Sequence, residues 1–325
     1  MRTRLCELLG ISVPIIGAPF GPWSSVELAA AICEAGGLGS LGTAVRPVKQ
    51  LREQWAQLRE LTDRPFAINH QPRPFSLEAF RATLDAHPAV ISYHMGDPGD
   101  LVDQAHEAGC LWMQQVMDID QARRAVARNV DIIVAQGGEA GGHSGFVSTL
   151  VLVPQVVEVA PATGPSSLLG GIADGRGLAA ALCLGASGVV MGTRFLASTE
   201  MAVRPEWKEM IIRAESRDAR HSAVTDLILP PYNRPHDPAS VRVLPTAFAA
   251  ELAQRPDELA ERAVTLGPTI IAEILAGGGE GYVPFAGQSV GLIRDIRSAG
   301  DIVRQTMEEA EQVLHSLTSE SALQT

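Results

Sequence analysis

Cysteine is scarce in this sequence, and no two cysteines are paired in a metal-binding or redox motif. Cys6, Cys33, Cys110 and Cys183 are widely separated along the 325 residues, and none belongs to a Cys-x-x-Cys pair. This spacing favours neither a zinc site nor a disulfide framework. Each cysteine lies in an apolar segment, so we expect all four to be small core residues.

Basic residues are also fewer than acidic residues. The sequence has 26 Lys and Arg against 37 Asp and Glu, which gives a formal net charge of -11. A balance of this sign disfavours nucleic acid and anionic membranes as partners. The 46% hydrophobic and 19% charged residues are typical of a soluble globular protein with an ample core. The length fits one large domain, with or without an appendage.

Long apolar runs are missing as well. No uninterrupted run approaches the roughly 18 residues that a membrane-spanning helix needs. The first residues are basic, but Glu7 and Pro14 interrupt what could otherwise be the apolar core of a signal peptide. We therefore expect a cytoplasmic protein without a membrane partner.

The sequence does contain a regular alternation of short apolar strands and amphipathic helices, which predicts βα units and a parallel sheet. No Gly-x-Gly-x-x-Gly follows the first strand, which argues against a Rossmann sheet. Eight strands with their connecting helices fit a (β/α)8 TIM barrel better. The expected strands cover residues 13–18, 38–41, 66–68, 90–93, 111–116, 132–135, 167–169 and 188–191.

The alternation stops after Phe195, so we expect three segments: a barrel over residues 1–195, a helical cap over residues 196–285, and a return to the barrel over residues 286–325. The cap would cover the barrel mouth. The helices expected in the cap lie near residues 205–214, 247–254 and 257–263. The cap is interrupted by a loop that contains Pro230, Pro231, Pro235 and Pro238. The last helix of the chain is expected over residues 299–317.

Three helix boundaries inside the barrel follow from local signals. Ser24, with Glu27 three residues later, predicts a capping box at the start of the first barrel helix. Asp97-Pro98 predicts another helix start, because Asp is a good N-cap and Pro suits the first helical position. Pro154 should bend or shorten the helix expected near residues 150–159.

The most informative stretch is a glycine-rich loop after the sixth strand. Five glycines lie within residues 137–145, and such density indicates unusual backbone conformations or close approach by a ligand. His143 lies in this loop, where an imidazole could serve as a general base near neutral pH. An incidental histidine on a flexible surface loop is the alternative. Glu139 could orient His143 or cap the following segment, and the two roles carry equal weight.

Other strand exits carry small or neutral polar residues, and working residues of TIM barrels cluster there. Glycine-rich turns after strands seven and eight predict a phosphate site. Its donors would be main-chain amides, and neutral side chains could hydrogen-bond the edge of a flat heterocycle. A phosphorylated planar ligand is therefore expected, with ordinary glycine-containing turns as the alternative. The amides are those of Gly171, Gly192 and Thr193, and the side chains are those of Asn69, Gln115 and Gln136.

Several other catalytic patterns are disfavoured. His143 has no metal-ligand partner at helical spacing, so we expect no metal. Ser144 is not in a Gly-x-Ser-x-Gly elbow, and the match at residues 287–291 lacks the buried strand that such an elbow requires. Asp174 fits a structural N-cap. Surface positions are expected for His87, His106 and His315, whereas His70, His94, His221 and His236 could reach the barrel mouth.

Three parts of the sequence resemble one known family. They are Pro-Ile-Ile-Gly-Ala-Pro at 14–19, Gln-Gly-Gly-Glu-Ala-Gly-Gly-His-Ser-Gly at 136–145, and the glycine loop at 170–177 through Met-Gly-Thr-Arg-Phe at 191–195. In this order and spacing they resemble the flavin-dependent nitronate monooxygenases, formerly called 2-nitropropane dioxygenases, and their relatives, the flavin-dependent enoyl-acyl-carrier-protein reductases. The likeness covers most of residues 1–200, with a weaker match at 286–291.

The resemblance implies FMN in the barrel, with its phosphate at Gly171 and Gly192-Thr193. His143 falls on the active-site histidine of the family, which is associated with handling the nitroalkane proton and binding the nitro group. The flavin then takes an electron from the nitronate, and the reduced species reacts with oxygen. The implied cofactor-binding residues are Ala18, Pro19, Phe20, Asn69, Gln115, Gln136, Gly141, Gly170, Gly171, Gly192 and Thr193.

Some departures from the family pattern bear on the substrate pocket. Phe20 stands where methionine is common, His70 follows Asn69 where an apolar residue is common, and residues 167–169 replace the usual approach to Gly170. We expect FMN-dependent oxidation of alkyl nitronates with molecular oxygen. The alternatives are an NAD(P)H-dependent enoyl-thioester reductase and a redox-silent barrel binding protein. The expected partners are a small-molecule substrate and O2, and a homodimer is left open.

Overall fold

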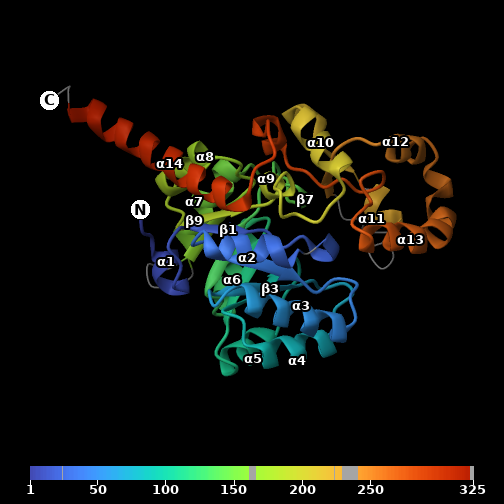
Figure 1. Ribbon diagram of the computed structural model, residues 1–325, viewed down its shortest axis with the longest axis horizontal. Helices are drawn as coiled ribbons and strands as arrows, with labels where there is room; N and C mark the ends of the chain where they lie inside the picture. Colours follow the sequence, from blue (N-terminus) through green and yellow to red (C-terminus); the bar gives the residue numbers. More distant parts are fainter. Residues whose placement is uncertain (24, 161–165, 223, 229–240, 323–325) are drawn as a thin grey trace.

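A parallel sheet of eight strands forms the centre of the computed structural model, which describes residues 1–23, 25–160, 166–222, 224–228 and 241–322 (Figure 1). The strand order is β1-β9-β8-β6-β5-β4-β3-β2. Leu38, directly before β2, bridges Ile16 of β1 and brings the two ends of the sheet together. The predicted (β/α)8 TIM barrel is confirmed. The strands are β1 (Ile15–Gly17), β2 (Gly39–Gly42), β3 (Phe66–His70), β4 (Val90–His94), β5 (Leu111–Val116), β6 (Ile132–Ala135), β8 (Ser166–Gly170) and β9 (Gly188–Met191).

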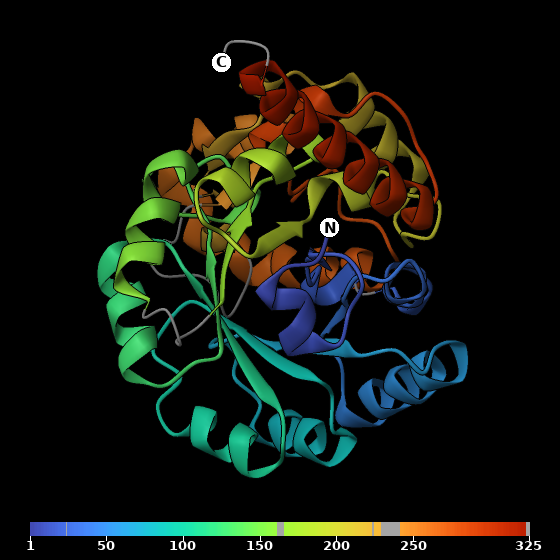
Figure 2. The ribbon, with the colours of Figure 1, turned by 90° about the vertical axis from the view of Figure 1, so that its left-hand side faces the viewer.

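Helices surround the sheet because each connecting helix buries one apolar face against it (Figure 2). In α3, Leu51, Trp55 and Leu58 recur at helical spacing and are all buried, as their pattern predicts. The short η1 (Gly21–Trp23) follows β1. The barrel helices are α2 (Val26–Glu34), α3 (Val48–Leu61), α4 (Leu77–Ala86), α5 (Leu101–Glu107), α6 (Ile119–Ala127), α7 (Thr149–Val159), α8 (Gly175–Cys183) and α9 (Thr193–Leu196).

Local signals misplaced one helix start. The helix α5 begins at Leu101, so the start predicted at Asp97-Pro98 was wrong. The Asp97 carboxylate instead accepts the Gly99 amide at 2.9 Å and pairs with Arg128, which holds these residues in a turn. Ser24 lies outside the described residues, and Ser25 caps α2 by accepting the amide of Leu28.

Pro154 lies inside α7 and does not shorten it. The helix continues to Val159 because its inner face, formed by Leu152, Val153 and Val156, is fully buried against the barrel. Packing of this face outweighs the backbone hydrogen bond that a proline removes.

A helix that the sequence analysis missed, α1 (Arg4–Leu9), adds a small core next to the barrel strands. Leu5, Cys6 and Leu9 of α1 pack in one cluster with apolar side chains of β1, β6 and β8. Cys33 and Cys110 are buried as well, but Cys183 at the end of α8 is exposed, so its predicted core position was wrong. The end of α8 faces solvent, and helical spacing alone did not reveal this.

The cap contains the predicted helices and also two strands of a small sheet that was not predicted, whose third strand comes from the barrel part. Strand β7 (Gly142–His143) pairs with β11, which pairs with β10, both antiparallel. Figure 1 shows α11 to α13 as a lobe far from the C-terminus. The proline-crowded loop at 230–238, with His236, lies outside the described residues. The elements are α10 (Pro205–Arg213), η2 (Ser216–Asp218), β10 (Arg220–Ser222), α11 (Val224–Ile228), β11 (Val241–Val243), α12 (Ala247–Ala253), η3 (Pro256–Glu258) and α13 (Leu259–Leu275).

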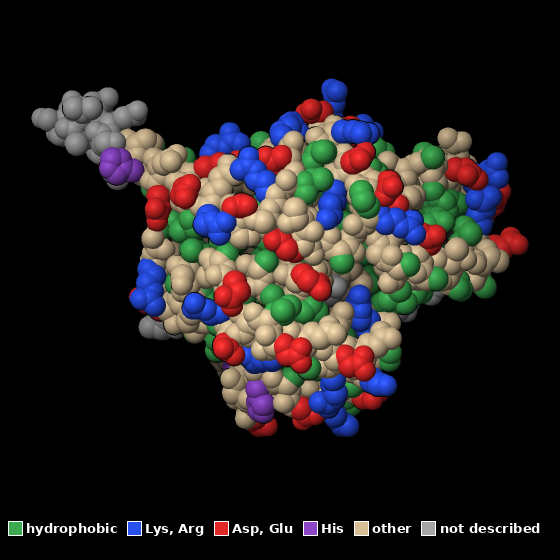
Figure 3. Space-filling model, in the orientation of Figure 1, with side chains coloured by type: hydrophobic (Ala, Val, Ile, Leu, Met, Phe, Trp, Pro, Cys, Tyr) green, Lys and Arg blue, Asp and Glu red, His purple; other side chains and the backbone are tan. Residues whose placement is uncertain are grey.

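The end of the chain returns to the barrel through η4 (Gln288–Leu292) and α14 (Ala299–Ala322), which packs on α8 and α2. A side chain at Gly175 would lie 2.5 Å from the backbone of α14, so this contact requires glycine. Acidic and basic side chains are interspersed over the face in Figure 3. Within the described part of the chain, no helix is both long and apolar enough to cross a bilayer.

Candidate active site

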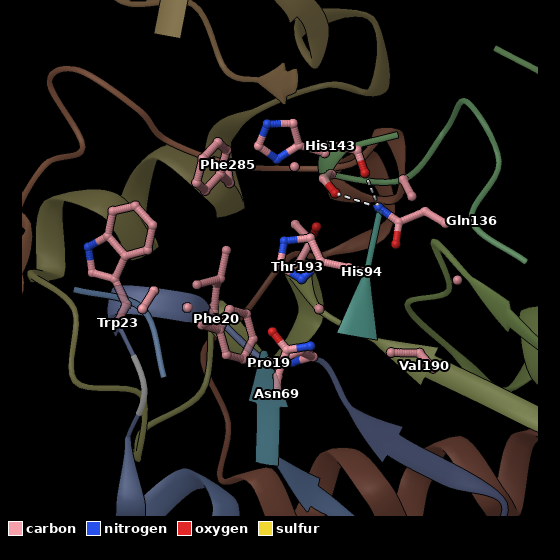
Figure 4. A pocket seen from close by; sticks show the side chains of 18 of the residues that line it. Pro19, Phe20, Trp23, Asn69, His94, Gln136, His143, Val190, Thr193 and Phe285 are labelled. Atoms are coloured by element: carbon pink, nitrogen blue, oxygen red, sulfur yellow. Dashed lines mark hydrogen bonds between the residues drawn. The ribbon is translucent and has the colours of Figure 1, made fainter. Parts of the chain in front are cut away.

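The predicted site residues surround a cavity at the C-terminal ends of the barrel strands (Figure 4). Every one of them lines it except Ala18, whose amide bonds to the Met191 carbonyl at 2.8 Å. Ala18 lies behind Gly192, because a Cβ added to Gly192 would be 3.4 Å from the Ala18 Cβ. The structure thus brings residues from strands β1 to β9 to one place.

Two glycine turns form a group of amide donors at one side of this cavity. Strands β8 and β9 are neighbours, with Gly170 opposite Val190, so their exits are adjacent. Gly171 has a φ of 88°, a conformation that favours glycine. The amides of Gly171, Gly192 and Thr193 donate no hydrogen bond to any residue that the structure describes. Unused amides at a cavity wall suit an anionic group such as a phosphate.

The chain segment after the cap holds this group of amides in place. The Thr193 hydroxyl accepts the Gly287 amide at 2.9 Å, and the Gln288 amide bonds to the Glu139 carbonyl at 2.8 Å. A Cβ on Gly141 would be 2.6 Å from the Gly287 nitrogen, so this close approach needs glycine. Ser289 of the same segment lines the cavity and was missed, although the weaker family match at 286–291 pointed to it.

His143 lies in strand β7, so its backbone is fixed by sheet pairing and is not a flexible loop. It pairs with Val241 of β11, and its carbonyl accepts the Gln136 side-chain amide at 2.7 Å. The Gln115 side chain donates to the same carbonyl at 3.5 Å. Figure 4 shows the imidazole at the cavity together with that of His94. The glycine-rich stretch therefore presents His143 on a defined backbone.

Glu139 caps a helix, which is one of its two predicted roles. Its carboxylate accepts the amide and hydroxyl of Thr149, the first residue of α7, and the hydroxyl of Ser148. Burial alone would raise the pKa of Glu139, but these hydrogen bonds outweigh burial and hold the pKa below its usual value. The carboxylate is ionised at neutral pH and stabilises the N-terminus of α7.

Of the other histidines, His94 reaches the cavity, and it does so at the exit of β4. Burial, with a smaller contribution from neighbouring His143, lowers the pKa of His94 to about 3, so the ring is neutral near pH 7. His70 is buried elsewhere, with its ring nitrogens at hydrogen-bond distance from Thr43 and Thr83. His221 of β10 packs against Phe146 instead of lining the cavity.

In the three predicted amide side chains, the NH2 group is hydrogen-bonded within the described protein and the oxygen is not. The Asn69 NH2 donates to Ser92, and the NH2 groups of Gln115 and Gln136 donate to the His143 carbonyl. Among the described residues, no donor binds the side-chain oxygens of these three. Such oxygens can accept an N–H at the edge of a heterocycle.

An apolar wall of the cavity was missed altogether. Its members come from η1 and the cap, and sequence patterning could not separate them from ordinary core residues. No Lys, Arg, Asp or Glu is found among the described residues that line the cavity. We call this wall the apolar annex; it consists of Trp23, Trp207, Ile271, Ile274 and Phe285.

The structure shows the local environment of Asp174 and of the Gly-x-Ser-x-Gly match at residues 287–291. Asp174 caps α8 by accepting the Gly177 amide at 3.1 Å, as predicted. Residues 287–291 fall largely in the 3-10 helix η4, which has no elbow geometry. In the described ranges, no three His, Cys, Asp or Glu side chains are grouped so that they could hold a metal ion.

The model of the nitronate monooxygenase family matches residues 2–81 and 75–309. A nitronate monooxygenase from Paraburkholderia phytofirmans is 31% identical over 97% of each chain. A (3aS,4S,5R,7aS)-5-hydroxy-7a-methyl-1-oxo-octahydro-1H-indene-4-carboxyl-CoA dehydrogenase from Mycobacterium tuberculosis is 35% identical over 66% of this chain, and the match spans only 61% of that protein. The structure of FabK from Thermotoga maritima superposes with a TM-score of 0.88 and 31% identity, over 98% of this chain and 99% of that one. The chain therefore belongs to the nitronate monooxygenase family and is a flavin-dependent oxidoreductase.

Proposed function

We propose that this chain binds FMN and oxidises alkyl nitronates with molecular oxygen, with His143 as the active-site base. The observation that carries the proposal is the placement of unused amides at the exits of β8 and β9 in the same cavity as a histidine on a sheet-fixed backbone. The cavity wall has no fixed charge in its described part, which suits a planar neutral ring.

The residues present fit a phosphorylated flavin. The amides of Gly171, Gly192 and Thr193 would hold the phosphate, and the side-chain oxygens of Asn69 and Gln136 would accept from the ring edge. Pro19 and Phe20 at the exit of β1 would contact the ring. Bound flavin would supply the one-electron oxidation of the nitronate and the reaction with O2.

His143 acts on neutral nitroalkanes in this proposal. The Cα–H bond breaks, the proton goes to the imidazole, and the electron pair moves into the nitro group to give the nitronate. His94 does not compete for this proton, because a group with a pKa of about 3 is a much weaker base near neutral pH. The single N–H of this neutral ring is directed at the backbone of His70, so the other ring nitrogen is only an acceptor.

A substitution at His143 tests this assignment. His143→Ala should keep flavin, lose most turnover of neutral nitroalkanes, and retain turnover of preformed nitronates, which need no proton removal. Equal loss with both substrate forms would remove His143 from the role of base. Mass spectrometry of the cofactor released on denaturation tests FMN against FAD.

The 35% identity to a protein named as a CoA-thioester dehydrogenase favours a second candidate, a thioester oxidoreductase that uses NAD(P)H. Anaerobic mixing separates the two. Rapid bleaching of the flavin by NADH or NADPH would favour the reductase, and bleaching by a nitronate would favour the monooxygenase. Purified protein that is colourless and takes up no added FMN would instead indicate a redox-silent binding protein.

A further inference from the structure

The apolar annex occupies one side of the cavity. Figure 4 shows Trp23 and Phe285 on the side away from Gln136 and Val190. Trp23 comes from η1 at the barrel, whereas Trp207 comes from α10 and Ile271 and Ile274 come from α13. The annex thus forms where the cap meets the barrel.

Aromatic packing fixes the shape of this annex. The ring of Trp23 is edge-on to Trp207 with centroids 5.1 Å apart, and edge-on to Phe285 at 5.5 Å. The Trp23 indole donates to the Gly278 carbonyl at 2.8 Å, so its polar edge is already satisfied. Trp207 Nε1 is buried without a hydrogen-bond partner among the described residues, so apart from this one N–H the annex offers a preformed surface of aromatic and aliphatic carbon.

The side chains of the annex offer no opposite charge to a charged substituent. A carboxylate placed against the annex would lose its hydration without gaining a cation, since no Lys or Arg lines the described cavity. An uncharged hydrocarbon group gains from the same surroundings, because its apolar area leaves water.

From these observations we propose that the annex binds an uncharged hydrophobic substituent of the substrate. The chain would then prefer nitronates with long, branched or aromatic tails over nitroethane, and would reject a carboxylated substrate such as 3-nitropropanoate. This specificity rests on the proposed nitronate oxidation. Each methylene that enters the annex should raise affinity by up to about fourfold.

Binding can be measured without turnover. Primary amides are neutral planar analogues of nitroalkanes, so butanamide, hexanamide, octanamide and 3-phenylpropanamide serve as probes in calorimetric titrations of the flavin-loaded protein. Affinity should rise along the alkyl series and be high for 3-phenylpropanamide, and succinamate, with its charged tail, should bind at least tenfold more weakly than hexanamide. Flat affinity along the series, or succinamate binding as well as hexanamide, would overturn the proposal.

A charge placed in the annex gives a second test. Ile271→Asp should reduce the ratio of octanamide to butanamide affinity at least tenfold. Val264→Asp on the same helix is the matched control, because Val264 is 76% exposed and does not line the cavity, and its ratio should equal that of wild type. If Ile271→Asp does not fold, Ile271→Ala should still lower the ratio, by about three- to tenfold. An unchanged ratio in a folded Ile271 variant would contradict the assignment.

Turnover distinguishes failure of this inference from failure of the proposed function. The ratio of kcat/KM for 1-nitrohexane nitronate to that for nitroethane nitronate should exceed tenfold. Turnover of both nitronates at equal efficiency would refute the role of the annex while supporting nitronate oxidation. Tail-dependent amide binding without turnover of any nitronate would support the annex and refute the proposed reaction.

Discussion

The indole nitrogen of Trp23 donates a buried hydrogen bond of 2.8 Å to the carbonyl of Gly278, joining the first barrel loop to the end of the cap. Gly279 next to it has a φ of 99°, and a Cβ there would be 2.9 Å from Ile274, so the chain needs glycine to make this approach. One side chain thus links the two parts that together line the cavity.

Removing this hydrogen bond should destabilise the protein. Trp23→Phe leaves the Gly278 carbonyl buried without a donor, which costs about 1–3 kcal/mol. Trp55→Phe is the control, because Trp55 is equally buried but its indole nitrogen has no partner in the described part of the chain. Urea unfolding of both variants measures the difference. Equal loss of stability in both would mean that the bond to Gly278 contributes nothing.

Glu139→Gln should weaken the start of α7 without affecting the base. Gln keeps one acceptor oxygen, so the variant loses the negative charge and the hydrogen bonds accepted by the other oxygen, from Ser148 or Thr149, which should cost about 1–2 kcal/mol at pH 7. Because the pKa of Glu139 is lowered in the folded state, this stability is present above its unfolded pKa and disappears as pH falls through the folded pKa. The pH profile of nitroalkane turnover should stay unchanged; a shifted profile would show that Glu139 acts on His143.

Acid should destabilise the protein through His70. Burial lowers the pKa of His70 from 6.5 to about 3, so the unfolded chain binds a proton between these values and the folded chain does not. The contribution of His70 to the free energy of unfolding is therefore fully present above pH 6.5 and decreases as pH falls, by up to about 2 kcal/mol between pH 7 and pH 5. His70→Gln should remove this part of the pH dependence, as measured by urea unfolding at both pH values. The same slope in the variant would show that other groups cause it.

Gly192→Ala tests the amide donors at the exit of β9. The new methyl would meet only the Ala18 Cβ, at 3.4 Å, so the fold should survive while the methyl enters the space next to the amides. We expect flavin to bind about 10- to 100-fold more weakly, from the loss of hydrogen bonds to a charged group. Gly281→Ala is the control, because a Cβ there meets nothing within 4 Å. Tight flavin binding in both variants would remove Gly192 from the phosphate site.

The barrel and the positions of its exit residues could be predicted because they depend on local patterns. Short apolar strands at regular intervals indicate a parallel sheet, and in a closed barrel their ends must converge, which brought Asn69, Gln136 and Gly192 to one cavity. Helix starts were less predictable, as Asp97 shows, since the same residue that caps a helix can also hold a turn.

The missed features depend on contacts between residues far apart in the chain. Strand β7 has two residues and exists because β11 pairs with it across about a hundred positions, a pairing that no local pattern indicates. The apolar annex could not be predicted for the same reason. Trp207 and Ile274 have the helical spacing of ordinary core residues, and only the tertiary structure shows that they face a cavity.

A crystal structure of the protein with FMN bound is the most direct test of the central claim. The account predicts the phosphate within hydrogen-bond distance of the amides of Gly171, Gly192 and Thr193, with the ring in the cavity that His143 lines. A phosphate held elsewhere, for example in the second hollow lined by Arg176, Arg194 and Arg297, would contradict the account.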